Sequence, residues 1–97
     1  MKSRGEILAT LGEFKSCAAS RYGIESIGVF GSVARNEQTD CSDIDIFYTG
    51  KALSLLKMDL LQCELEKLFG CKVDIVRLRE NMNPLLRNRI VKEGCNV

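Results

Sequence analysis

Histidine is absent from this 97-residue chain, and proline occurs only once, at Pro84. Without an imidazole, the chain cannot form a Ser-His or Cys-His nucleophile pair, a histidine metal ligand or an imidazole proton shuttle. Any chemistry must therefore use carboxylates, hydroxyls, thiols, amines or backbone groups. No proline-rich linker or internal repeat interrupts the chain, so we expect residues 1–97 to form one continuous domain.

The chain also lacks an excess of charge of either sign and a long apolar run. Fourteen Lys and Arg residues against thirteen Asp and Glu give a net charge of +1, so we expect no stable nucleic-acid binding. No apolar stretch approaches the ~20 residues that span a bilayer. The N-terminus carries Lys2, Arg4 and Glu6 where a secretory signal would be apolar. These absences predict a cytoplasmic protein with no membrane association.

Five cysteines are present, but none of them forms a C-x-x-C pair. Their odd number and wide spacing argue against a zinc site or a redox dithiol. We therefore expect free thiols in a reducing compartment. The cysteines are Cys17, Cys41, Cys63, Cys71 and Cys95.

Hydrophobic periodicity predicts an α/β (α+β) domain in which helices flank a short mixed β-sheet of three or more strands. A capping box at Ser3 and Glu6 marks the start of the first helix. Asn83 as N-cap and Pro84 at the first helical position mark the start of the last one. Expected helices cover residues 4–20, 55–69 and 84–93, and expected strands cover 24–30, 43–48 and 72–76.

Gly31 and Ser32 follow the first expected strand and form the first half of a candidate site. A glycine there lets the chain turn tightly and lets a phosphate approach bare amides, and Ser32 adds a hydroxyl donor. Arg35, at the end of this turn, fits either a phosphate contact or a solvated ion at a helix end. A Gly-Ser pair alone usually marks only a turn.

Three aspartates form the second half of the candidate site. Asp43 and Asp45 are two residues apart on a strand, so their side chains point the same way with Cα atoms about 6.5 to 7 Å apart. Asp74 interrupts an otherwise apolar strand. Oxygen ligands of this kind select Mg²⁺ or Mn²⁺, and two such ions clamp the reacting oxygens in phosphoryl transfer. One Asp-x-Asp alone could be a solvated face, but three aspartates in two short strands oppose β propensity.

The segments Gly31–Arg35 and Ser42–Ile46 resemble the G-S-x10-D-x-D signature of minimal nucleotidyltransferase (MNT) proteins in the polymerase-beta-like superfamily. Asp74 matches the third acid of that family. The resemblance covers nearly the whole chain. It departs at Asn36, where many relatives carry glycine, and asparagine also tolerates the left-handed conformation.

The resemblance implies transfer of a nucleoside monophosphate from an NTP, usually ATP, to an acceptor hydroxyl with release of pyrophosphate. By analogy, Gly31 and Ser32 bind the β- and γ-phosphates, and Asp43 and Asp45 hold two magnesium ions. Asp74 ligates the catalytic metal ion and helps to deprotonate the acceptor. The family's partners are HEPN-domain toxins, which MNT antitoxins neutralise by adenylylating a tyrosine or by binding.

Three hypotheses follow for the function. The first is an Mg²⁺-dependent protein adenylyltransferase that acts as antitoxin to a HEPN partner, because 97 residues leave no segment for an acceptor pocket. The second is a non-catalytic module that masks its partner. The third is a small-molecule nucleotidyltransferase whose acceptor pocket is built by a partner. Transfer of label to protein, to a small molecule or to neither distinguishes them.

Overall fold

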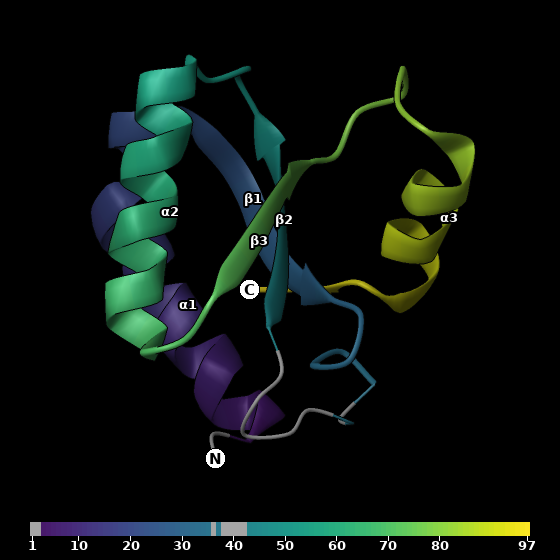
Figure 1. Ribbon diagram of the computed structural model, residues 1–97, viewed down its shortest axis with the longest axis horizontal. Coiled ribbons are helices and arrows are strands. Elements are labelled where there is room, and N and C mark those ends of the chain that lie inside the picture. The colour runs from purple at the N-terminus through teal and green to yellow at the C-terminus, as the bar shows by residue number, and fades with distance from the viewer. Residues whose placement is uncertain (1–2, 36, 38–42) are drawn as a thin grey trace.

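The computed structural model, which describes residues 3–35, 37 and 43–97, contains three helices and a four-stranded mixed sheet (Figure 1). The strands lie in the order β3-β2-β1-β4, with β1 antiparallel to both neighbours and β2 parallel to β3. In chain order the elements are α1 (Arg4–Tyr22), β1 (Ile24–Phe30), β2 (Ile44–Gly50), α2 (Leu55–Phe69), β3 (Val73–Arg77), α3 (Pro84–Glu93) and β4 (Cys95–Asn96).

The sheet has a different helical cover on each face. Helices α1 and α2 pack on one face, and α3 lies alone on the other (Figure 1). Because side chains alternate along a strand, Ile44 and Ile46 of β2 enter the core beneath α1 and α2, while Phe47 joins Phe30 and Ile90 beneath α3. Asp45, the residue between those isoleucines, therefore faces α3.

The predicted fold class and element order are confirmed, with small shifts at the boundaries. Helix α1 continues to Tyr22, and strands β2 and β3 each begin one residue later than expected. Strand β4 was missed, because two residues carry no period-two pattern. It forms where α3 returns the chain to the free edge of β1, pairing Val29 with Cys95.

The parallel β2–β3 pair depends on the crossover helix α2. Parallel neighbours need a long connection, and a helix packed on the sheet provides it. Helix α2 is delimited by Ser54, whose hydroxyl accepts from the Lys57 N–H, and by Gly70 at φ 70°. Both parallel strands then start at the same end of the sheet, which brings Asp45 and Asp74 into register.

The described cysteines and helices bear on the thiols and on the apolar character of the chain. Cys17, Cys63 and Cys95 are free thiols, as expected, whereas Cys41 lies outside the described residues. Within the described ranges, no helix combines the length and apolar character needed to cross a bilayer.

Helices α1 and α2 are joined by a polar clamp at Glu64. The Tyr22 hydroxyl donates to one Glu64 oxygen, and Arg21 donates to the other at 3.3 Å. The hydrogen bond from Tyr22 is the main cause that lowers the pKa of Glu64. Burial, followed by that same hydrogen bond, raises the pKa of Tyr22 to about 12.

Replacing Glu64 by Gln is expected to lower the free energy of unfolding at neutral pH by about 1 kcal/mol, since the clamp is partly exposed. A lowered carboxyl pKa stabilises the fold above the group's ordinary pKa, and this contribution disappears as the pH falls through the folded value. The difference in the free energy of unfolding between wild type and variant should therefore become smaller at acidic pH. Urea unfolding at several pH values measures it, with Asp59→Asn as an exposed control on the same helix. If the difference in the free energy of unfolding does not change with pH, the ionised Glu64 does not stabilise the fold in this way.

Candidate functional site

Two of the three predicted acids lie side by side on the α3 face of the sheet. Asp45 of β2 pairs in register with Asp74 of β3, and on the other side Asp45 is the partner of Phe30. Neighbouring strands are about 4.8 Å apart, so two carboxylates in register point into the same space. Asp43, directly before β2, is exposed.

The electrostatics of Asp45 show how closely the charged groups of this region interact. Burial is the largest effect raising its pKa, and the carboxylates of Asp74 and then Asp43 raise it further. The guanidinium groups of Arg89 and Arg35 act in the opposite direction. Asp45 is therefore the point at which three acids and two arginines meet electrostatically.

Gly31 makes room for the Asp45 carboxylate. Its φ is +72°, which side chains with a Cβ rarely adopt. A Cβ at this position would also collide with the carboxylate of Asp45. Glycine is therefore required twice, by the backbone turn and by the close approach of Asp45.

The turn after Gly31 is short and helical. The Arg35 N–H donates to the Gly31 carbonyl at 3.1 Å, and the Glu37 N–H donates to the Ser32 carbonyl at 2.8 Å. As in the first turn of a helix, the N–H groups of residues 32–34 have no acceptor inside the turn. Val33 and Ala34 are buried and Ser32 is half-buried. The sequence prediction of a tight Gly-Ser turn directly after β1 is confirmed.

Arg35 lies in an ion-pair network that the sequence analysis did not identify. Its Nη1 contacts Glu93 Oε2 at 3.0 Å, and its Nε contacts Glu37 at 3.2 Å. Glu93 also faces Arg89, one turn earlier on α3. In this structure Arg35 therefore makes the ion pairs expected of a helix-end arginine. Arg89 and Glu93 were missed because the sequence does not reveal that α3 folds back over the acids.

The donor set suits a hard divalent cation. Two adjacent carboxylates repel each other and favour a bound cation, and oxygen-only ligands favour Mg²⁺ or Mn²⁺. Across residues 3–35, 37 and 43–97, no three acidic or cysteine side chains are already gathered as a metal site. Asp45 and Asp74 thus form a pair, with Asp43 at the start of the same strand. These positions fit a site completed by the phosphate oxygens of a ligand.

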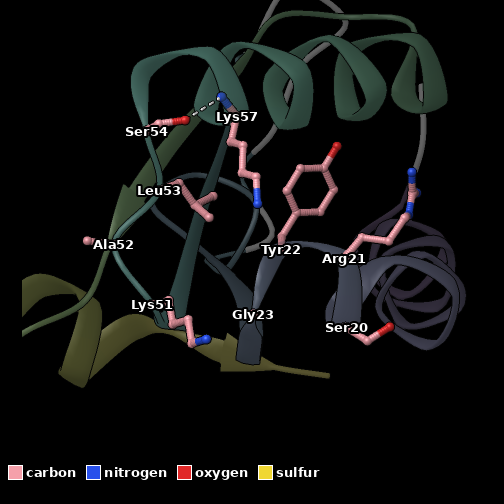
Figure 2. A pocket seen from close by; sticks show the side chains of 9 residues that line it. All are labelled: Ser20, Arg21, Tyr22, Gly23, Lys51, Ala52, Leu53, Ser54 and Lys57. Atoms are coloured by element: carbon pink, nitrogen blue, oxygen red, sulfur yellow. Dashed lines mark hydrogen bonds between the residues drawn. The ribbon is translucent and has the colours of Figure 1, made fainter.

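A cavity of about 360 Å³ lies at the opposite end of the sheet, between the end of α1 and the start of α2 (Figure 2). Its lining contains Arg21, Lys51 and Lys57 and no carboxylate. Figure 2 shows the Lys57 side chain extending toward Tyr22. The described lining of this cavity therefore offers no carboxylate to a metal ion, whereas the α3 face of the sheet carries Asp45 and Asp74 in register.

Comparison with known proteins identifies the family. Residues 13–97 match the family Polymerase beta, Nucleotidyltransferase. The protein adenylyltransferase MntA of Thermococcus cleftensis is 35% identical over 89 residues, which cover 91% of this chain and 89% of that protein.

Solved structures agree with the family match. A structure described provisionally as a minimal nucleotidyltransferase superposes with a TM-score of 0.72 at 33% identity, covering 93% of this chain and 95% of that one. A Shewanella oneidensis MNT antitoxin structure, in complex with a tri-AMPylated HEPN toxin, shares the fold with a TM-score of 0.69 at 21% identity. This match covers 93% of the present chain and 70% of the other. The chain therefore belongs to the polymerase beta nucleotidyltransferase family and is a nucleotidyltransferase of the minimal type.

Proposed function

We propose that this nucleotidyltransferase transfers AMP from ATP to the hydroxyl group of a tyrosine on a HEPN-type partner and thereby acts as an antitoxin. The observation that carries the proposal is the register of Asp45 and Asp74 beside the Gly31 turn. This arrangement supports the proposal, because two carboxylates then lie near a turn whose N–H groups suit a phosphate. Transfer of AMP to protein is the activity named for MntA of T. cleftensis.

Each residue has a separate task in the proposed reaction. Asp43, Asp45 and Asp74 would hold two Mg²⁺ ions, which supply charge stabilisation to the reacting phosphate when bound. Gly31 and Ser32 would bind the β- and γ-phosphates. The acceptor oxygen forms a bond to the α-phosphorus, the bond to the bridging oxygen breaks, and pyrophosphate leaves. The acceptor proton passes to Asp74.

The acceptor is proposed to be a protein, held in part by the exposed surface of α2. Leu55, Leu56 and Leu60 are 87%, 71% and 51% exposed, and apolar patches of this kind mark interaction sites. Lys51 and Lys57 of the neighbouring cavity add positive charge. A structural neighbour is an MNT antitoxin in complex with a HEPN toxin. Because ATP is the proposed donor, we place the reaction in the cytoplasm.

Intact-mass analysis of the co-expressed partner, with and without Mg²⁺ and ATP, tests the proposal. We expect increments of one or more AMP units that require both Mg²⁺ and ATP. Increments on a small hydroxyl compound, with an unmodified partner, would instead support small-molecule transfer. An unmodified partner that is nevertheless neutralised would support masking, for which the exposed α2 leucines are also suited.

The double substitution Leu56→Asp and Leu60→Asp is expected to weaken the complex with the partner at least ~10-fold, because it places two charges in the apolar contact. The fold should be little affected, since neither side chain belongs to the core. Calorimetric titration measures the affinity. Leu85→Asp, at a leucine that is 79% exposed on α3, is the control on another surface. Equal losses in both variants would refute the assignment of this surface.

A further inference from the structure

One carboxylate on α3 joins two arginines beside the acid pair. Glu93 Oε2 lies 3.0 Å from Arg35 Nη1 and 3.9 Å from Arg89 Nε. Glu93 is the most buried of the three, with 24% of its side chain exposed against 39% and 53% for the arginines. Glu93 therefore connects the turn after β1 to the last turn of α3.

Arg89 has more unused N–H donors than Arg35. Its Nε faces Glu93 at 3.9 Å, too long for a strong hydrogen bond, and among the described residues Arg89 makes no side-chain hydrogen bond and no further ion pair. A guanidinium group has five N–H donors in a planar fork, which match the oxygens of phosphate. Arg35, in contrast, already uses its Nε and Nη1 on two glutamates.

Arg89 lies on the part of α3 that packs over the strand ends near Asp45. Its neighbour Ile90 packs against Phe30 and Phe47, Phe30 pairs with Asp45, and the Arg89 guanidinium acts electrostatically on Asp45. Asp45 and Asp74 repel the phosphates of an incoming nucleotide, and a neighbouring guanidinium offsets that repulsion. Arg35, at the turn after β1, is the other cation that acts on Asp45.

We propose that Arg89 binds the polyphosphate of the nucleotide and that Glu93 positions Arg89 and Arg35 for this contact. The inference rests on the proposed function for the identity of the ligand as a nucleoside triphosphate. Arg89 is then a binding residue, and Glu93 acts only through the two arginines. Asp43, Asp45 and Asp74 would hold the ions, and Arg89 would offset phosphate charge that the ions leave uncompensated.

Calorimetric titration of the full chain with Mg²⁺ and the non-hydrolysable analogue AMP-PNP tests the inference, with AMP and pyrophosphate as partial ligands. We expect Arg89→Ala to weaken AMP-PNP and pyrophosphate about 10-fold or more and to leave AMP nearly unchanged. Arg89→Lys should recover part of the loss, because it keeps the charge without the fork. Glu93→Gln should weaken AMP-PNP by a few-fold. Lys92→Ala, an exposed cation on the same turn, is the matched control.

Two further readouts separate this role from a structural one. Mn²⁺ affinity without nucleotide should stay the same or rise in Arg89→Ala, since a cation near the acids is removed. Equal weakening of AMP and pyrophosphate, or AMP-PNP binding as in the wild type, would overturn the inference. If wild type binds AMP-PNP but modifies no protein, the proposed function fails while the role of Arg89 stands.

Discussion

Replacing Asp45 by Asn is expected to reduce AMP transfer to the partner by on the order of 10³-fold or more, because the substitution removes a charged ligand for the ions that stabilise the reacting phosphate. The fold should be as stable as the wild type or more stable. Burial and the neighbouring Asp74 disfavour the ionised Asp45, as its raised pKa indicates, and Asn relieves that repulsion without changing the shape.

Transfer of label from α-phosphate-labelled ATP and thermal unfolding measure the two effects separately. Asp59→Asn removes an exposed carboxylate from α2, far from the sheet face that bears Asp45, and should change neither quantity. If Asp45→Asn labels the partner as fast as the wild type, the acid pair does not carry the reaction. If transfer is lost together with the fold, Asp45 has a structural role instead.

Replacing Gly31 by Ala should reduce transfer by about 10²-fold, because the new Cβ displaces the Asp45 carboxylate and small displacements of a catalytic group have effects of this size. Stability should also fall, by about 1 to 2 kcal/mol, since alanine is strained at φ +72°. Labelling assays and chemical denaturation measure the two losses.

Gly70→Ala is a close control for this prediction. Gly70 has nearly the same φ, +70°, but a Cβ there meets no atom within 4 Å. Both variants should therefore lose similar stability, and only Gly31→Ala should lose activity beyond what unfolding explains. Equal activity in the two variants would show that the approach of Gly31 to Asp45 has no catalytic consequence.

The sequence predicted most of the fold because its local signals agree with each other. The predicted caps at Ser3 and Asn83 lie where α1 and α3 begin. Strand β4 could not be predicted in this way, because it depends on the return of α3 to the edge of β1 rather than on its own two residues.

The candidate site was predicted in its residue types more than in its arrangement. The sequence singled out Asp43, Asp45 and Asp74 because aspartate is unfavourable in strands. Their catalytic and metal-binding roles, and those of Gly31 and Ser32, stay predictions for the experiments above. Arg35 was left between two interpretations, and the structure shows its ion pairs with Glu37 and Glu93.

The sequence by itself determined the three helices, the strands β1 to β3, the family and the residue types of the candidate site, since these depend on side-chain identity and short-range spacing. Only the tertiary structure decided that Asp45 lies in register with Asp74, that its carboxylate excludes a Cβ at Gly31, and that α3 brings Arg89 and Glu93 to the acids. Register and helix docking are set by burial of apolar surface across segments far apart in the chain. A local sequence pattern therefore does not predict which distant residue will lie beside a given carboxylate.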